Sequence, residues 1–290
     1  MYVLENNRLK VEVAAPGDVY SGSRFDWTGF ITQVTLDGTV TYCVPERLES
    51  GAGTGGIGLS NEFGIDAPLG YDAVKPGEQF LKIGVGLLTK AEETAYDFFY
   101  NYDVAPADVK VNNKDQTVTF DTSAESPSGY GYHLVKEIAL DNNHLVISYI
   151  LTNTGEIGFK TNEYAHNFIG INSHKVDKDY KLTLPNMRSL DVTVGKIDVS
   201  NNQLTWPVVP DGDFYAHIDM DKIRVGYNWD LYHKTVRAGV KEQVFFEPEK
   251  MALWGRAHVI SPEVFIDITL APGEIKKWKR CYQFYQRTGQ

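Results

Sequence analysis

The amino-acid sequence predicts an all-β protein with the architecture of a large antiparallel β-sandwich. Short segments of alternating apolar and polar residues recur along the whole chain, and clusters of turn residues separate them. The 3.6-residue periodicity of amphipathic helices is weak throughout. Of the 290 residues, 42% are hydrophobic, which is enough for a large core. Because neither a low-complexity linker nor a fixed-period repeat interrupts this pattern, we interpret residues 1–290 as a single β-domain.

The first third of the chain predicts a strand, a hairpin, a loop and a further strand. Arg8–Ala14 alternates polar and apolar residues and reads as a strand. FITQVTL and TVTYCV flank Asp37-Gly38, the strongest short-range hairpin signal in the sequence. The glycine-rich segment Glu49–Gly64 matches no phosphate-binding fingerprint, and we interpret it as a mobile loop that lets backbone and ligand approach closely. Phe80–Lys90 is apolar again and predicts one strand.

The rest of the chain predicts strands at short spacing. AEETAY, starting at Ala91, is the one short candidate helix, and the segment Ala95–Val104 is rich in aromatic residues. Asp141-Asn142-Asn143 joins two apolar segments and predicts a hairpin. The segments expected as strands are DVKVNN, QTVTFDT, GYHLVKEIAL, HLVISYILTN, YKLTLP, SLDVTV, FYAHIDMD, KIRVGYNWDLYH, VKEQVFFEPEK, MALWG, HVISPEVFIDITL and IKKWKRCYQFYQ.

One strand carries a histidine between aromatic residues. The segment Thr161–Asn172, TNEYAHNFIGIN, follows an apolar, β-branched run. If it is a strand, alternation puts Tyr164, His166 and Phe168 on one face. His166 would then lie on a rigid support where its protonation state can be controlled. A half-buried histidine with a purely structural role remains the alternative.

A second strand carries a glutamate after a proline. In HVISPEVFIDITL, alternation points Val264, Ile266 and the later apolar residues into the core. Glu263 and Phe265 then face solvent or a cleft. A solvated edge glutamate is the alternative, and nothing in the local sequence shows that Glu263 meets His166.

Charge and composition exclude several classes of protein. The chain has 38 acidic and 28 basic residues, a net charge of −10 and a pI near 5.2, which argues against nucleic-acid or anionic-membrane partners. There is no CxxC, HExxH or Walker motif, so we expect neither a metal nor a cofactor. Cys43 and Cys281 are expected to be reduced thiols. With no signal peptide visible and no apolar run of membrane-spanning length, we expect a cytoplasmic protein.

The order of these features resembles the galactose mutarotase superfamily, the aldose 1-epimerases and their relatives. In that family an apolar strand ending in Asn precedes a strand with a catalytic His, as in ILTNTGEIGFKTNEYAHNF with His166. A later Glu near a strand start precedes a Pro-Gly-Glu-like turn and a final Trp-containing strand, as in SPEVFIDITLAPGEIKKW with Glu263 and Trp278. The resemblance covers most of the chain in order and spacing and is specific at these two places.

The resemblance implies a β-supersandwich that interconverts the anomers of a sugar by acid–base ring opening. It implies Glu263 as the general base and His166 as the general acid, because both forms of a histidine are accessible near neutral pH. The candidate sugar-stacking residues, each of which could equally pack in the core, are Trp27, Tyr164 and Trp254. The candidates for polar ligand contacts are Arg24, Asp26, Glu62, Lys82 and Asn167.

Three functions stay open on the sequence alone. The first is an epimerase of a neutral sugar, or of a uronic or phosphorylated sugar if Arg24 binds an anionic group. The second is a non-catalytic carbohydrate-binding protein on the same fold. The third, a glycoside hydrolase or polysaccharide lyase, ranks last. Glu263 and Asp267 share a strand face but lie roughly 13 Å apart, more than the separations of about 5 to 9.5 Å that glycosidases use.

Overall fold

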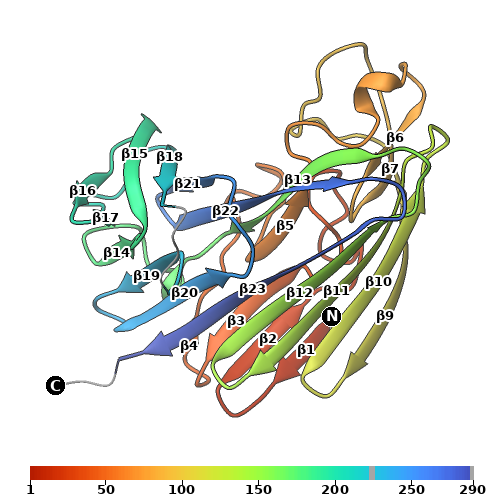
Figure 1. The fold of residues 1–290 in the computed structure, drawn as a ribbon. Coiled ribbons are helices and arrows are strands. Elements are labelled where there is room, and N and C mark those ends of the chain that lie inside the picture. The colour runs from red at the N-terminus through yellow and green to blue at the C-terminus, as the bar shows by residue number, and fades with distance from the viewer. Residues whose placement is uncertain (222–225, 288–290) are drawn as a thin grey trace.

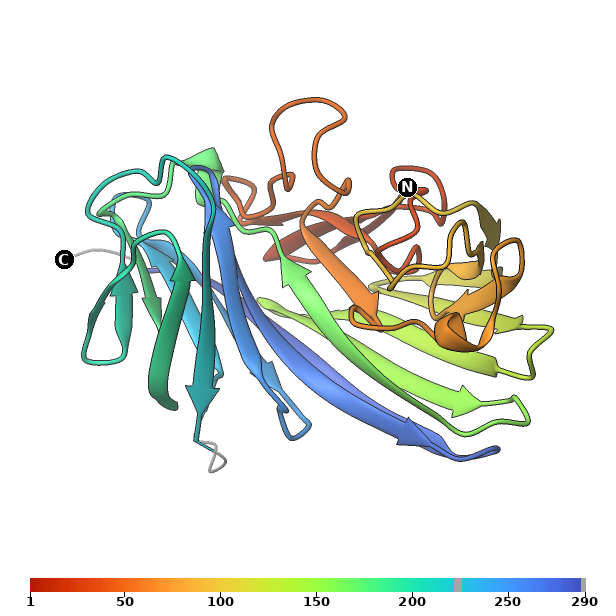
Figure 2. The same cartoon turned by 90° about the horizontal axis from the view of Figure 1, so that it is seen from above.

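The fold is described from a computed structural model, which defines residues 1–221 and 226–287. Two large antiparallel sheets pack face to face, and a small three-stranded sheet lies beside them (Figure 1). The view from above shows the long, twisted strands of both sheets running alongside one another (Figure 2). This architecture confirms the predicted antiparallel β-sandwich.

The first large sheet has the strand order β1-β2-β3-β5-β13-β22-β21-β18-β15, and β4 pairs with β3 at its side. Its strands are β1 (Tyr2–Glu5), β2 (Leu9–Val13), β3 (Ile31–Leu36), β4 (Val40–Thr41), β5 (Leu59–Phe63), β13 (Phe159–Asn167), β15 (Met187–Val194), β18 (Phe214–Met220), β21 (Met251–Arg256) and β22 (Val259–Leu270).

The second large sheet has the strand order β16-β17-β14-β19-β20-β23-β12-β11-β10-β9. Its strands are β9 (Asp108–Lys114), β10 (Thr117–Glu125), β11 (Gly131–Asp141), β12 (His144–Asn153), β14 (Tyr180–Thr183), β16 (Asp198–Ser200), β17 (Gln203–Thr205), β19 (Trp229–His233), β20 (Ala238–Val244) and β23 (Ile275–Gln286).

The small sheet joins β6 (Gln79–Lys82), β7 (Gly86–Thr89) and β8 (Val104–Pro106). Two single turns of 3₁₀-helix, η1 (Tyr71–Ala73) and η2 (Ile171–Ser173), lie in connections. In the described residues no helix has the length and apolar character needed to cross a membrane.

Alternating burial explains why these segments are strands. In β12 every second side chain is buried, from Leu145 to Leu151, so one face of the strand packs into the core between the sheets. β22 differs, because its residues are buried on both faces as far as Ile266. One face of β22 contributes Val264 and Ile266 to the core, as predicted, while the opposite face lies under the candidate site.

The turn signals give hairpins where they were expected. Asp37 and Gly38 both have positive φ angles, 49° and 67°, which is the geometry of the tight turn that Asp-Gly favours between strands. Asn142 also has a positive φ, 54°, at the turn between β11 and β12. Both hairpin predictions are confirmed by the pairing of β3 with β4 and of β11 with β12.

Two local predictions are wrong, and a third is wrong at its end. Ala91–Tyr96 forms bends and no helix. Phe80–Lys90 is not one strand, because the chain turns at Ile83–Val85 and forms the hairpin of β6 and β7. The predicted loop Glu49–Gly64 ends in β5, whose pairing with β13 is a non-local contact that the glycine-rich composition concealed. The start of the strand expected in KIRVGYNWDLYH, residues 222–225, lies outside the described residues.

A fully buried ion cluster joins the two large sheets. Arg280 on β23 donates from Nη2 to Glu163 Oε2 on β13 at 2.8 Å and from Nη1 to Glu242 Oε1 on β20 at 3.0 Å. Nη2 also donates to the carbonyl oxygen of Val264 on β22 at 2.8 Å. Arg280 and both glutamates have no exposed surface, so each charge depends on its partners for stabilisation.

Candidate active site

The site forms where two neighbouring strands separate. The ladder between β13 and β22 ends at the pair Tyr164–Phe265 and resumes only at an isolated bridge between Ile169 and Ile260. Pro262 lies in this gap. Proline has no backbone N–H to donate, and because the ladder is interrupted here, no ladder hydrogen bond is lost. This interruption opens a space that the side chains of both strands can fill.

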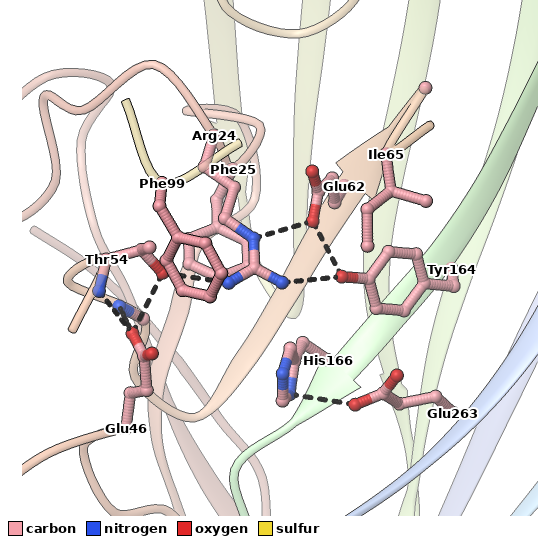
Figure 3. Close-up of polar contacts among 12 residues, drawn as sticks. Arg24, Phe25, Glu46, Thr54, Glu62, Ile65, Phe99, Tyr164, His166 and Glu263 are labelled. Atoms are coloured by element: carbon pink, nitrogen blue, oxygen red, sulfur yellow. Dashed lines mark hydrogen bonds and ion pairs between the residues drawn. The ribbon is translucent and has the colours of Figure 1, made fainter. Parts of the chain in front are cut away.

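His166, Ser261 and Glu263 fill this space. The Ser261 hydroxyl lies 2.7 Å from His166 Nδ1 and 3.1 Å from Glu263 Oε1. His166 Nδ1 itself lies 3.3 Å from Glu263 Oε1 (Figure 3). The Ser261 oxygen also accepts the backbone N–H of Asn167 at 2.9 Å, which fixes the hydroxyl between the two titratable groups.

Aromatic rings hold the imidazole in place. Phe168 stacks on His166 at a centroid distance of 4.0 Å, and Trp254 meets it edge-on at 5.2 Å. Tyr164 lies 6.0 Å from it and stacks in turn on Phe265. Phe168 therefore covers one face of the imidazole, while the hydrogen bond to Ser261 fixes the rotation of the ring.

Burial governs the protonation of the His166–Glu263 pair. Both residues are only 5% exposed, and burial disfavours the charged form of each. Burial, with a smaller contribution from the Arg24 charge, lowers the pKa of His166 well below 6.5. Burial raises the pKa of Glu263 to about 8, against the opposing effect of Arg24. Both shifts favour a neutral imidazole and a protonated carboxyl group near pH 7.

A second polar cluster lies beside the pair. Arg24 donates from Nε to Glu62 Oε2 at 2.8 Å, from Nη1 to Thr54 Oγ at 3.0 Å and from Nη2 to Tyr164 Oη at 3.0 Å (Figure 3). Lys82 Nζ lies 3.2 Å from Glu62 Oε1. Burial alone would raise the pKa of Glu62, but the charges of Arg24 and Lys82 outweigh it and the pKa lies below its usual value. Glu62 is thus an ionised anchor for Arg24.

A cavity of about 400 Å³ lies over these groups. Its size is within the range of small-molecule sites. Aromatic rings and charged groups together form its wall, and this combination suits a ligand with apolar ring faces and polar edges. Its aromatic lining consists of Phe98, Phe99, Tyr164, Tyr215, Trp254 and Phe265.

The structure brings half of the sequence-predicted site residues to this cavity. Arg24, Tyr164, His166, Trp254 and Glu263 all line it, although they come from distant parts of the chain. Of these, His166 and Glu263 are in contact. The predicted face of β13 is also observed, since Tyr164 and His166 line the same cavity and Phe168 stacks on His166.

The other predicted ligand contacts do not line this cavity. Asp26 is 1% exposed and pairs with Lys136. Trp27 donates its indole N–H to the Gly22 carbonyl and packs between two small apolar clusters. Asn167 donates to the Pro262 carbonyl at 2.6 Å and accepts from Tyr282, which holds β22 beside β13 across the interrupted ladder.

Glu62 and Lys82 also lie behind the cavity wall, where they form ion pairs with each other and, through Glu62, with Arg24. Both side chains are completely buried. Glu62 holds Arg24 by a direct ion pair, and Lys82 contacts the other oxygen of the same carboxylate.

Several cavity residues escaped the sequence analysis. Phe98 and Phe99 lie in the connection between β7 and β8, and Phe99 is 66% exposed. The aromatic richness of this segment was a visible signal, because exposed aromatic residues in a loop are typical of binding sites. Glu46, which lines the cavity, and Ser261, which is buried between His166 and Glu263, carried no such signal, since their positions depend on long-range contacts.

A cluster of potential metal ligands lies elsewhere, outside the cavity lining. One ligand atom each from Asp177, Asp179 and His233 lies within 4.8 Å of the others. The protein itself satisfies part of this set, since His233 Nδ1 accepts the Val236 N–H at 3.2 Å and Asp179 accepts the Thr235 hydroxyl.

No protein-family model matches the chain, and no curated protein matches its sequence. Solved structures do match. A galactose mutarotase-like protein from Lactobacillus casei ATCC 334 superposes with a TM-score of 0.60 at 14% identity, covering 98% of this chain and 100% of that one. The Slr1438 protein from Synechocystis sp. PCC 6803 gives a TM-score of 0.64 at 13% identity, covering 99% of this chain and 96% of that one.

A GalM/aldose epimerase homologue from C. elegans gives a TM-score of 0.56 at 9% identity, covering 97% of each chain. Likeness at such low identity is evidence about the fold and leaves the activity to be argued from the site. By its strand arrangement over almost its entire length, this chain has the galactose mutarotase-like fold.

Proposed function

We propose that this protein is an aldose 1-epimerase-like isomerase, a mutarotase that interconverts the anomers of a sugar. The observation that carries the proposal is the contact between His166 and Glu263, 3.3 Å apart in the wall of a small-molecule cavity. The fold of mutarotase-like proteins supports the same conclusion by analogy.

Anomer exchange requires a group that accepts a proton and a group that donates one. The acceptor takes the proton of the anomeric hydroxyl, the bond between C1 and the ring oxygen breaks, and the donor protonates that oxygen. Rotation about the C1–C2 bond and reclosure on the other face give the second anomer, and both protons return. Two adjacent groups that share one proton can carry out both transfers, each typically worth about 10²- to 10⁴-fold in rate.

The burial of the pair favours resting roles opposite to those expected from the sequence. That expectation assigned an ionised Glu263 as base and an imidazolium at His166 as acid. A lowered His166 pKa and a raised Glu263 pKa instead favour neutral His166 as the proton acceptor and protonated Glu263 as the donor. The total number of protons on the pair is one in both descriptions. A ¹⁵N NMR spectrum of His166 in the resting protein should therefore show neutral imidazole at pH 7.

The proposal is tested by following the equilibration of freshly dissolved α-anomers. Polarimetry or NMR on glucose, galactose and mannose, with and without protein, measures the exchange above the spontaneous rate. We expect acceleration of at least one sugar. Sugar binding without any acceleration would instead identify a non-catalytic carbohydrate-binding protein, the alternative on the same fold.

The catalysed rate should be level near neutral pH and should fall as the pH rises into the alkaline range. Above the Glu263 pKa of about 8 the pair loses its shared proton, so kcat/KM should fall by about tenfold per pH unit. Between pH 6.5 and 7.5 it should stay level, because the His166 pKa lies well below 6.5. The measurement is kcat/KM from pH 5.5 to 9.5 after subtraction of the buffer-catalysed rate. A rate that keeps rising above pH 8 would show that the fully deprotonated pair is the active form.

A further inference from the structure

One carboxylate oxygen in the cavity wall has no protein partner among the described residues. Glu46 lines the cavity and is 4% exposed. Its Oε2 accepts the Thr54 N–H at 2.7 Å, the Thr54 hydroxyl at 2.9 Å and, at the long distance of 3.4 Å, the Gly56 N–H. Figure 3 shows the Thr54 contacts converging on one oxygen of the carboxyl group. The other, Oε1, has no hydrogen-bond donor within residues 1–221 and 226–287.

Glu46 is held rigidly although it lies in a loop. Its backbone N–H donates to the Gly56 carbonyl at 2.8 Å, next to an isolated bridge between Pro45 and Ile57. Thr54, which donates to Glu46, accepts in turn from Arg24. A buried side chain fixed in this way can bind a ligand without first losing rotamer freedom.

The loop also passes directly against the carboxyl group. Gly53 has a φ of +71°, and a Cβ atom there would lie 2.8 Å from both Cδ and Oε1 of Glu46. Glycine is therefore required for the loop to pack on this side of Glu46, and it leaves no side chain that could donate to Oε1.

The remaining cavity charges are paired. Within the described chain the cavity-lining cations each have an acidic partner: Arg24 with Glu62 at 2.8 Å, Arg47 with Asp213 at 2.9 Å, and Lys250 with Asp66 at 4.0 Å. Glu46, in the same described part, has no basic side chain within 4.0 Å of its oxygens. An anionic ligand would thus meet the unpaired Glu46 carboxylate and would have to compete with Glu62 for Arg24 and with Asp213 for Arg47, the two closely paired cations.

We infer that Glu46 is a substrate-binding residue whose Oε1 accepts a hydrogen bond from a hydroxyl group of a neutral sugar, and that it selects against uronic and phosphorylated sugars. The inference rests on the proposed function, because that function is what makes the ligand a sugar. A ligand hydroxyl supplies the donor that the protein lacks, whereas a carboxylate or phosphate supplies only negative charge. On the sequence alone, Arg24 left open whether the sugar is neutral or carries an anionic group. The position of Glu46 favours a neutral sugar.

Binding of a sugar panel to the wild type and to Glu46→Gln tests the inference. Ligand-observed NMR would give the Kd of glucose, galactose, mannose and galacturonate, followed by the monodeoxy derivatives of the tightest neutral sugar. In Glu46→Gln the amide takes the place of Oε1 and offers N–H groups instead of an acceptor. Hydrogen bonds to charged groups contribute enough to predict a weakening of about 10- to 100-fold for the neutral sugar.

The deoxy series identifies the hydroxyl concerned. One monodeoxy sugar should bind the wild type more weakly by a similar factor, and Glu46→Gln should not weaken its binding further. Glu46→Asp, which keeps the charge but withdraws the oxygens by one methylene, should also weaken the neutral sugar while galacturonate stays disfavoured. Glu49→Gln, an exposed glutamate in the same loop, is the matched control and should bind like the wild type.

Three results would overturn the inference: unchanged affinity of a natively folded Glu46→Gln, tighter binding of galacturonate than of galactose to the wild type, or binding of no neutral sugar. A separate measurement of anomer exchange distinguishes failure of the inference about Glu46 from failure of the proposed function. Binding that depends on Glu46 without acceleration would leave the inference standing and remove the isomerase. Accelerated anomer exchange with sugar binding that does not depend on Glu46 would support the isomerase and overturn the inference.

Discussion

Replacing His166 or Glu263 by glutamine is expected to lower the protein-accelerated rate of anomer exchange by about 10²- to 10⁴-fold. Glutamine has nearly the shape of the glutamic acid that it replaces but cannot transfer a proton, and at position 166 it removes the only group of the pair that accepts one. Sugar affinity should change far less than the rate, because the cavity wall around the pair remains. The rate is measured by polarimetry or exchange NMR on the sugar that the wild type equilibrates fastest.

The double variant His166→Gln/Glu263→Gln sharpens this test. Two groups that share one proton act as a unit, so the double variant should be about as slow as the slower single variant. Asp267→Asn is the matched control, since Asp267 lies on the same strand β22 but is exposed and outside the cavity. Full activity in both single variants, with wild-type sugar binding, would remove the pair from the mechanism.

Replacing Arg280 by methionine is expected to lower the free energy of unfolding by about 3–5 kcal/mol. The substitution would leave Glu163 and Glu242 buried without their shared cation, and neither can reach solvent. Domains of this kind are typically stable by about 5–15 kcal/mol, so this is a large part of the total. Urea unfolding followed by tryptophan fluorescence measures the change.

Two further variants separate lost charge compensation from lost packing. Arg280→Met combined with Glu163→Gln and Glu242→Gln should recover much of the stability, because no buried charge is then left unpaired. Arg188→Met is the matched control. The Arg188 side chain is 55% exposed in its pair with Asp219, and exposed pairs contribute about 0–1 kcal/mol. Equal destabilisation by Arg280→Met and Arg188→Met would contradict the assignment.

The destabilisation of Arg280→Met should shrink as the pH falls. Burial already raises the pKa of Glu242 although Arg280 opposes it, and removal of Arg280 would raise it further. The folded variant then binds protons more tightly than the unfolded chain, so its stability relative to the wild type increases towards acidic pH.

Local patterns in the sequence were sufficient where local physics controls the structure. The apolar, β-branched run HLVISYILTN predicted β12, and the Asp37-Gly38 and Asn142 turns predicted two hairpins, because each depends on a few consecutive residues. Composition failed to predict the local structure where the role of a glycine or an aromatic residue depends on long-range contacts. β5 lies in a glycine-rich segment and is held as a strand by pairing with β13, while Phe98 and Phe99 serve the cavity without being in any strand.

The sequence by itself determined the class of the fold, most of its strands and the two residues, His166 and Glu263, that were predicted to act together. It could do so because alternation, turn chemistry and family resemblance are all written in residue order. Only the tertiary structure decided that the ladder between β13 and β22 opens at Pro262, that the two side chains meet there, and that Glu46 faces the same cavity. The burial and the nearby charges that shift the pKa values of the pair also come from the tertiary structure, because they depend on residues far apart in the chain.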